Sequence, residues 1–162
     1  MQLTLRPCAN ADLDELYRLD QICFQPGIAY PRSELRYYLQ HPRFFSLAAV
    51  DESEGKIYGF AVAKCGPRAG LLTGHLITID VDPEVRHRGA GTLLLQGIER
   101  ELRRRGAAAV RLEVAVDNEG AQAFYRRAGY TQTGLLRGYY LGTLDALVME
   151  KAIGAEDGVS GR

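Results

Sequence analysis

The sequence has few cysteines and no excess of charge of either sign. Its three cysteines are odd in number, widely spaced and free of any Cys-x-x-Cys pair, which argues against a disulfide framework and against a zinc site. The 20 basic side chains of Lys and Arg balance the 20 acidic ones of Asp and Glu. A chain without net charge lacks the general attraction that draws proteins to nucleic acids or membrane surfaces. We therefore expect no metal, no nucleic acid and no membrane among its partners.

Long hydrophobic segments are also missing. The sequence has no apolar run of about 18 residues, the length of a membrane-spanning helix, and its first six residues lack the basic head and apolar centre of a signal peptide. We expect a soluble, cytoplasmic protein. A chain of 162 residues is typical of one domain with a substantial core. We therefore expect a single domain over residues 1–153 and a flexible tail over residues 154–162.

Hydrophobic periodicity and turn residues predict, in chain order, a strand, two helices, three strands, a helix, a strand, a helix and two strands. Asn10 and Asn118 are expected to cap the first and last helices, and Gly129 is expected to follow the last one. The expected strands cover residues 3–7, 44–50, 56–64, 71–81, 108–116, 130–140 and 144–153, with a turn over residues 66–70. This order predicts an α/β (α+β) domain with a mixed, mainly antiparallel sheet.

A basic, glycine-rich segment, Arg-His-Arg-Gly-Ala-Gly-Thr, occupies residues 86–92 between an apolar strand and a helix with an apolar stripe. The first N–H groups of a helix have no partner within the helix, and the helix dipole adds positive charge there, so an anion binds well. Glycines let a ligand approach the backbone, and the basic residues add charge around a phosphate. A pyrophosphate fits this pattern. The alternative is an ordinary strand-to-helix turn with a solvated basic face.

The helix after this segment connects two strands that a crossover would make parallel neighbours. Ligands of such units lie beyond the carboxyl ends of the strands. There the sequence places residues 82–92 and then residues 116–118, with Glu113 and Tyr125 near the same edge. We therefore expect the chemistry at this edge of the sheet.

Several linked motifs in this region resemble a known family. They are Val81-Asp82-Pro83, the segment 86–91, Leu112-Glu113-Val114, Asn118, Ala121, Phe124-Tyr125, Gly129-Tyr130, and the segments 137–140 and 145–149. Together they are similar to the GNAT superfamily of acetyl-CoA-dependent N-acetyltransferases, in particular to the RimI-type protein N-terminal acetyltransferases. The resemblance covers residues 75–150, whereas residues 1–70 agree only in element order. It implies a three-layer fold, with a sheet of six to seven strands and four flanking helices, that forms one N-acetyltransferase domain over residues 1–153.

The resemblance also implies how acetyl-CoA is held. The strand before the turn would be splayed at a bulge, so that main-chain groups of Ile79 and Val81 hold the pantetheine arm, with a further hydrogen bond from Asn118. Main-chain N–H groups would hold the pyrophosphate, with basic side chains around it. The residues expected there are Arg86, His87, Arg88, Gly89, Ala90, Gly91 and Thr92.

Two catalytic residues follow from the same resemblance, Glu113 as the base and Tyr125 beside the thioester sulfur. A phenol with a pKa of about 10 is a weaker acid than a thiol at about 8.5, so complete proton transfer to the sulfur is uphill by about 2 kcal/mol. A hydrogen bond from Tyr125 to the departing sulfur is the safer expectation. The alternatives are a core tyrosine beside Phe124 and, for Glu113, a carboxylate paired on its strand. Glu84 is a weaker rival for the base.

The expected reaction is direct attack of an amine on the thioester, with a main-chain N–H near Val81 stabilising the oxyanion. An α-amine with a pKa of about 8 is roughly a tenth neutral at pH 7, whereas lysine is neutral about once in a few thousand molecules. We therefore expect the N-terminal α-amine of a protein or peptide as acceptor. Tyr30, Tyr139 and Tyr140 would border its cleft. A small-molecule amine or a protein lysine remains an alternative acceptor.

Two rival functions remain for the glycine-rich segment. A nucleotide-dependent oxidoreductase would also place glycines at a helix start, but Leu94 stands where its third glycine is required. A non-catalytic module that binds acetyl-CoA would have the same donor site. The sequence does not name the acceptor, and it leaves open a monomer or a homodimer.

Overall fold

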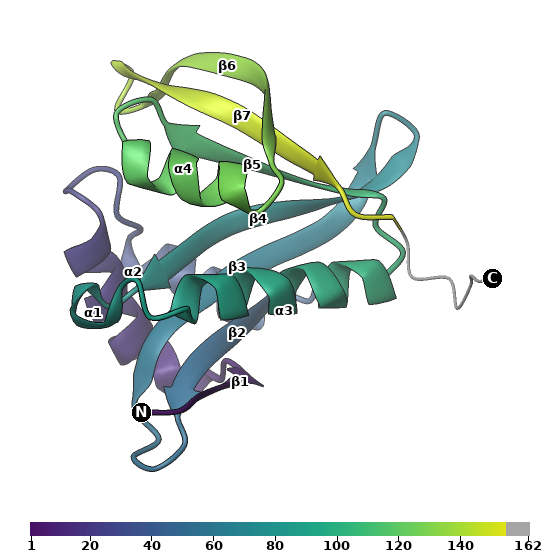
Figure 1. Ribbon diagram of the computed structural model, residues 1–162. Helices are drawn as coiled ribbons and strands as arrows, with labels where there is room; N and C mark the ends of the chain where they lie inside the picture. Colours follow the sequence, from purple (N-terminus) through teal and green to yellow (C-terminus); the bar gives the residue numbers. More distant parts are fainter. Residues whose placement is uncertain (155–162) are drawn as a thin grey trace. The chain divides into compact units, whose positions relative to one another are not determined.

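The computed structural model describes residues 1–154 and contains a seven-stranded sheet with the order β1-β2-β3-β4-β5-β7-β6 (Figure 1). The strands are β1 Leu3–Pro7, β2 Phe44–Asp51, β3 Ile57–Arg68, β4 Leu71–Val81, β5 Ala109–Ala115, β6 Thr131–Tyr140 and β7 Leu144–Ala152. The helices are α1 Leu13–Cys23, α2 Arg32–Gln40, α3 Ala90–Arg104 and α4 Glu119–Arg127, with short 3-10 turns η1 Asn10–Asp12 and η2 Pro83–Val85. β4 pairs with β5 in parallel, and the pairs β1–β2, β2–β3, β5–β7 and β6–β7 are antiparallel. The predicted mixed, mainly antiparallel sheet is confirmed.

The chain forms two compact units. The first comprises Met1–Lys64 and Leu76–Arg100, and the second comprises Cys65–His75 and the chain from Glu101 onward. Both β4 and α3 begin in one unit and end in the other. The expectation of one domain over residues 1–153 stays a prediction, and the predicted tail lies outside the described residues from residue 155 on.

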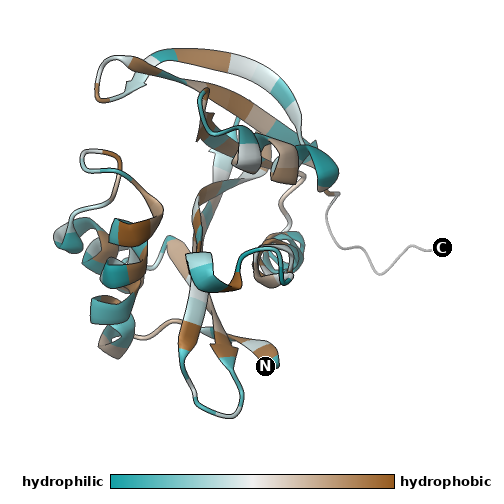
Figure 2. Cartoon of the chain, turned by 60° about the vertical axis from the view of Figure 1, so that its left-hand side comes forward, coloured by the Kyte–Doolittle hydropathy of each residue, from teal (hydrophilic) through white to brown (hydrophobic). Residues whose placement is uncertain are grey.

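Hydrophobic side chains hold the first unit together on both faces of its strands. On one face, Leu16 and Leu19 of α1 and Leu35 of α2 pack with Phe60 and other residues of β2 and β3. The first part of α3 covers the other face, and Figure 2 shows strands of this unit between the two groups of helices. These side chains recur at helical spacing, so one stripe of each helix is buried.

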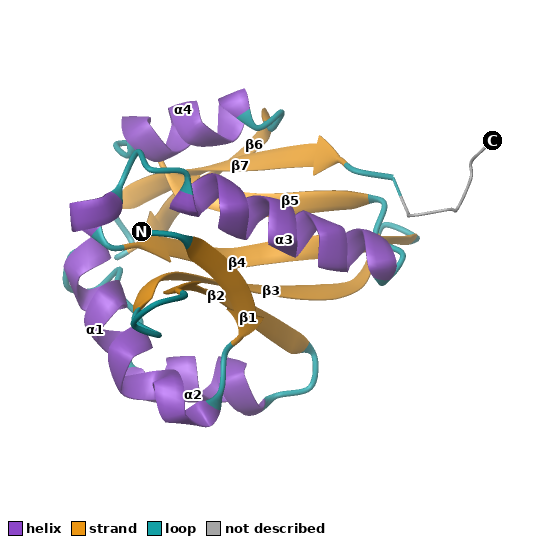
Figure 3. Ribbon diagram, turned by 60° about the horizontal axis from the view of Figure 1, so that its bottom comes forward, coloured by secondary structure: helices purple, strands orange, loops and turns teal. Residues whose placement is uncertain are grey.

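Two glycines of the first unit, one in β3 and one in α3, let α3 lie close to the strands. A Cβ on Gly59 of β3 would lie 3.2 Å from Leu94 of α3 and 2.8 Å from the carbonyl oxygen of Asp80, and a Cβ on Gly97 of α3 would clash with Leu5. Figure 3 shows α3 (purple) lying along these strands (orange). A larger residue at either position would push α3 and the turn before it away from the sheet.

In the second unit, β5 alternates between two faces. Val110, Leu112 and Val114 are buried, whereas Arg111 and Glu113 lie on the opposite face and are half-buried. This agrees with the predicted alternation, except that β5 ends at Ala115 and Val116 is exposed. The alternation places the charged residues of β5 together on one face of this unit.

The helix ends agree only in part with the sequence. Asn118 Oδ1 accepts a hydrogen bond from the N–H of Ala121 at 3.1 Å and caps α4, and Gly129 follows the helix with φ +101°, both as predicted. The cap predicted at Asn10 is wrong, because Asn10 begins η1 and the carboxylate of Asp12 accepts the N–H of Ala9 at 2.7 Å. Asp and Asn side chains compete for such local hydrogen bonds, and the Asp12 carboxylate that accepts the N–H of Ala9 also pairs with Arg6.

The turn after β3 is tighter than predicted. β3 continues through Arg68, and the reversal occurs at Ala69 and Gly70, which have φ of +52° and +81°. A two-residue turn with both φ positive matches the right-handed twist of the flanking strands. Pro67 does not stop the strand at this end, although it donates no hydrogen bond of its own.

Candidate active site

The turn between β4 and α3 belongs to the first unit and has the predicted strand–turn–helix form. β4 ends at Val81, and the N–H of Glu84 donates to Asp82 Oδ1 at 3.0 Å, which caps η2. His87 and Gly89 then take left-handed backbone conformations, with φ of +66° and +88°, before α3 begins at Ala90. Glycine takes this conformation without steric cost. The sequence therefore bends sharply enough to aim the start of α3 back along β4.

The start of α3 fits an anion. The carbonyl oxygen of Gly89 accepts the N–H of Leu93 at 2.9 Å, so the N–H groups of Ala90, Gly91 and Thr92 belong to the first turn and have no acceptor in the helix. A Cβ added to Gly89 would meet nothing within 4 Å. The side chains of Arg86, His87 and Arg88 are exposed around this space. The residues present thus suit a phosphate group by charge, by donors and by free space.

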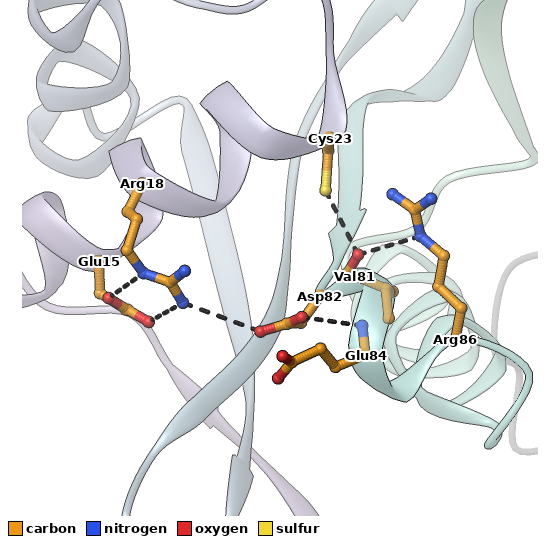
Figure 4. A network of polar contacts seen from close by, with 7 residues as sticks. All are labelled: Glu15, Arg18, Cys23, Val81, Asp82, Glu84 and Arg86. Atoms are coloured by element: carbon orange, nitrogen blue, oxygen red, sulfur yellow. Dashed lines mark hydrogen bonds and ion pairs between the residues drawn. The ribbon is translucent and has the colours of Figure 1, made fainter.

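The carbonyl oxygen of Val81 accepts two donors in the first unit. Arg86 Nε donates to it at 3.2 Å and Cys23 Sγ at 3.3 Å (Figure 4). Burial raises the pKa of Cys23 to about 11, and the nearby charge of Asp80 acts in the same direction. The thiol is therefore protonated and able to donate near neutral pH, so it links the end of α1 to the end of β4.

A pocket of about 560 Å³ opens beside this link, between α1 and the residues after β4. Arg18 crosses it, 2.6 Å from Glu15 Oε2 and 3.8 Å from Asp82 Oδ2 (Figure 4). The pocket is lined by Glu15, Arg18, Ile22, Lys56, Asp82, Pro83 and Glu84. Glu84, the weaker rival for the base, is exposed there.

In the second unit, Glu113 is held by two partners. Its Oε1 lies 2.7 Å from His75 Nε2, its Oε2 accepts a hydrogen bond from Arg111, and its side chain is 7% exposed. Burial raises the pKa of Glu113, but the hydrogen bond and charge of His75 and the charges of Arg111 and Arg68 outweigh it, so the pKa is below its ordinary value. The ion pair weighed as an alternative from the sequence is therefore present. A lowered pKa keeps Glu113 ionised and makes it a weaker base.

His75 is a site residue that the sequence analysis missed. It lies on β4 directly opposite Arg111 of β5 in the parallel ladder. Its Nδ1 is buried and has no hydrogen-bond partner among residues 1–154, while Nε2 faces Glu113. The sequence did contain one indication of this contact. The predicted parallel pairing of the two strands brings polar residues on the same face, such as His75 and Glu113, close together.

Tyr140 lies within electrostatic reach of Glu113 in the same unit. Burial raises the pKa of Tyr140, and the charges of Tyr139 and Glu113 raise it further. The rings of Tyr139 and Tyr140 are 4.9 Å apart and nearly perpendicular, and Tyr139 is 49% exposed. The structure therefore brings one predicted acceptor-binding tyrosine, Tyr140, near Glu113, and places the exposed Tyr139 against the Tyr140 ring.

The other predicted residues of the second unit lie at α4. Tyr125 is 9% exposed and packs edge-on against Phe124 and Tyr130, at 5.2 and 5.8 Å between ring centroids. Asn118 is exposed and uses its Oδ1 for the cap of α4. The contacts of Tyr125 with neighbouring rings agree with the alternative of a core tyrosine, and its role beside the sulfur stays a prediction.

Tyr30, the third predicted acceptor residue, lies in the first unit in the loop between α1 and α2. Its N–H donates to Asp20 Oδ2 at 2.5 Å, and its hydroxyl donates to the carbonyl oxygen of Ile77 at 3.4 Å. Its ring packs edge-on against that of Tyr38. The sequence pattern did not single out Asp20, because a lone acidic residue on a helix reads as a solvated one.

Comparisons with known proteins identify the family of the chain. Residues 13–130 match the acetyltransferase (GNAT) family. The chain is 30% identical to N-alpha-acetyltransferase 30 of Schizosaccharomyces pombe over 89% of its own length and 94% of the relative's. It is also 30% identical to the ribosomal protein bS18-alanine N-acetyltransferase of Escherichia coli, over 90% and 95%.

Solved structures share the same fold. A crystal structure of the ribosomal-protein-S18-alanine N-acetyltransferase from Escherichia coli has a TM-score of 0.81 and 25% identity, covering 99% of this chain and 100% of that one. Arabidopsis thaliana NAA60 in complex with a bisubstrate analogue has a TM-score of 0.82 at 20% identity, over 96% and 100%, which shows the fold alone. Fold and relatives together define an N-acetyltransferase. The chain belongs to the GNAT acetyltransferase family.

Residues 1–154 lack two features, a metal-binding cluster and a helix able to span a membrane. This part of the chain has no group of three or more His, Cys, Asp or Glu side chains able to hold a metal ion. Within the same residues, no helix is both long and apolar enough to cross a bilayer.

Proposed function

We propose that this chain transfers the acetyl group of acetyl-CoA to the N-terminal α-amine of a protein or peptide. The observation that carries the proposal is the turn from Val81 to Thr92, which has the donors and space for a pyrophosphate within a chain of the GNAT family. Two relatives that match nine tenths of the chain are named for N-terminal acetylation. The identity of the acceptor is inferred from these relatives and from the lower pKa of an α-amine relative to that of lysine.

The acetyl donor supplies a thioester, which an amine attacks directly. Main-chain N–H groups at the start of α3, with Arg86, His87 and Arg88, bind its pyrophosphate. Main-chain groups of Ile79 and Val81 orient the pantetheine arm. Release of the Val81 carbonyl oxygen by both Arg86 and Cys23 would free it for this purpose. The contributions of Asn118 to the pantetheine and of Tyr125 to the departing sulfur rest on the family resemblance.

Acetyl transfer requires a neutral amine, and this favours an α-amine over lysine. Glu113 is expected to take the amine proton through a water molecule, and His75 is expected to hold the Glu113 carboxylate in place and share the resulting proton. The support is the distance of 2.7 Å between His75 Nε2 and Glu113 Oε1. Because Glu113 is a weak base, an acceptor with a low pKa suits it better than lysine.

Tyr140 is proposed to contact the first residues of the acceptor, since it lies close to Glu113, and Tyr139 is proposed to contact them from beside the Tyr140 ring. Tyr30 is proposed to contact the acceptor from the loop between α1 and α2. We place the enzyme in the cytoplasm, where newly made protein N-termini arise, as a monomer or homodimer.

The proposal is tested by incubating the purified chain with acetyl-CoA and a pool of short peptides and small amines, followed by mass spectrometry. Acetylation of peptides with a free N-terminus supports it. Acetylation confined to small amines contradicts the acceptor. Calorimetry with acetyl-CoA and with NAD separates the rival functions: binding of acetyl-CoA without turnover of any amine favours a binding module, and binding of NAD alone contradicts the family function.

A further inference from the structure

Two buried carboxyl groups face each other inside the first unit. Asp20 of α1 is 0% exposed and Asp80 of β4 is 1% exposed, and their side chains are within hydrogen-bonding reach. Thr78 Oγ1 donates to Asp80 Oδ1 at 2.5 Å, and the N–H of Tyr30 donates to Asp20 Oδ2 at 2.5 Å. One oxygen of each carboxyl, Asp20 Oδ1 and Asp80 Oδ2, has no donor among the described residues.

Two ionised carboxylates cannot hydrogen-bond to each other, and two like charges removed from water repel strongly. One proton between them converts the repulsion into an O–H···O⁻ hydrogen bond and gives both remaining oxygens a partner. Such pairs keep a proton that isolated carboxyls would lose. The simplest chemical state of the two side chains therefore carries one proton and one negative charge.

The surroundings of the pair do not neutralise two charges. Arg86, from the turn after β4, is the cation that acts on Asp80, and its guanidinium also donates to the carbonyl oxygen of Val81. Cys23 of α1 is close enough for Asp80 to raise its pKa, and it faces the pair as a neutral thiol. Thr78 and the main chain of Tyr30 contribute neutral donors.

We propose that Asp20 and Asp80 share one proton and, as a hydrogen-bonded acid pair, position the loop that carries Tyr30 against β4. Asp20 holds the main-chain N–H of Tyr30, and Asp80 anchors Asp20 to the strand. The pair thus connects the loop proposed to contact the acceptor with the strand proposed to hold the donor. The effect on acceptor binding rests on the proposed function, whereas the shared proton does not.

The direction of the pKa agrees with this geometry. Burial, the hydrogen bond to Asp20 and the charge of Asp20 raise the pKa of Asp80 well above its ordinary value, against smaller opposing effects of Thr78 and Arg86. Because the folded chain then binds a proton that the unfolded chain releases, the free energy of unfolding falls as the pH rises above the ordinary pKa of aspartate. The fall continues until the raised pKa is passed.

The test replaces one carboxyl by an amide. Asp80→Asn keeps the shape and supplies a permanent N–H donor to ionised Asp20, and Asp20→Asn does the reverse. We expect the urea midpoint of the wild-type chain to fall as the pH rises above the ordinary pKa of aspartate toward the raised value of the pair, and each variant to lose most of this fall. Asp51→Asn is the matched control. Asp51 is also buried in the first unit, but its carboxyl accepts hydrogen bonds from Ser53 and stays ionised, so this variant should keep the wild-type fall.

A second measurement follows acceptor binding. In the wild-type chain the KM for an acceptor peptide is expected to rise several-fold at alkaline pH relative to Asp80→Asn, while the KM for acetyl-CoA changes equally in both. If the wild-type chain and both Asn variants show the same dependence of the urea midpoint on pH, the shared proton is ruled out. If the midpoints behave as expected but the acceptor KM does not differ, the positioning role is wrong.

A direct observation covers the case in which a variant does not fold. Isotope-edited infrared spectroscopy of wild-type protein with labelled aspartate should show a protonated carboxyl band at neutral pH. Absence of that band contradicts the proposal. Because neither this measurement nor the urea midpoint needs acetyl transfer, failure of the proposed function would leave both results interpretable.

Discussion

His75 on β4 and Glu113 on β5 meet with 2.7 Å between Nε2 and Oε1, next to the last pair of the parallel ladder between these strands. The ladder runs from Thr73 and Ala109 to His75 and Arg111. β4 continues from there to Val81 in the first unit, and β5 continues to Ala115 in the second. The pair therefore lies at the end of the paired region, and the splay expected after it stays a prediction.

Glu113→Gln should lower kcat/KM for an α-amine acceptor by about 10²-fold, the usual contribution of a general base. His75→Asn should lower it less, because His75 acts through the carboxylate. Arg111→Lys is the control, since it keeps a cation beside Glu113. Full activity of Glu113→Gln would remove the assigned base, and steady-state kinetics at several pH values measure all three variants.

The same carboxylate makes the folded state sensitive to acid. The pKa of Glu113 is lower in the folded chain than its ordinary value of 4.5, so its ion pairs stabilise the fold above that pH and are lost as the pH falls through the folded value. We expect Glu113→Gln to lower the free energy of unfolding by about 1–2 kcal/mol at neutral pH, a small value because the cost of burying the carboxylate opposes the gain from its ion pairs. Urea unfolding at several pH values should show this difference shrink as the pH falls below 4.5 and through the lower folded value, and a constant difference would contradict the ion pair.

Gly89→Val should abolish binding of acetyl-CoA. Valine strains a backbone with φ of +88° and places a branched side chain where the phosphate is expected, although the space itself is open. The strain costs about 1–2 kcal/mol. Gly55→Val is the matched control, because Gly55 also has positive φ, +71°, and open space, but lies in the turn between β2 and β3. Isothermal calorimetry should detect lost binding only for Gly89→Val; equal affinity in both variants would place the pyrophosphate elsewhere.

Tyr125→Phe should lower kcat by about tenfold or more if its hydroxyl stabilises the departing sulfur. The ring contacts with Phe124 and Tyr130 survive this change, so thermal stability should alter little. Tyr130→Phe removes a hydroxyl from the same aromatic cluster and serves as the control. An equal effect of both substitutions on kcat would indicate that Tyr125 is a core residue.

Local patterns were enough to predict most of the fold. The alternation of β5, the glycine turn before α3 and the caps of α4 at Asn118 and Gly129 depend on neighbouring residues in the chain, and the structure confirms them. The prediction for Asn10 failed because both Asn10 and Asp12 offer side-chain oxygens near this helix start, and it is Asp12, paired with Arg6, that accepts a main-chain N–H, that of Ala9. Such competition between equivalent caps depends on tertiary partners.

The sequence did not predict which residues that are far apart in the chain contact each other in the fold. Glu113 was a candidate from its strand motif, but its partner His75 is 38 residues earlier and is placed by the register of β4 against β5. Asp20 and Asp80 meet only because α1 packs on one face of the strands. Register and packing angle are set by the whole core, so local periodicity does not define them.

Tandem mass spectrometry of two matched peptides tests the central claim most directly. One peptide has a free α-amine and an internal lysine, and the other is identical but carries a blocked N-terminus. With acetyl-CoA and the purified chain, the account predicts an acetyl group on the α-nitrogen of the first peptide and no modification of the second. Equal acetylation of lysine in both peptides, with no label on the α-nitrogen, would contradict N-terminal acetyl transfer.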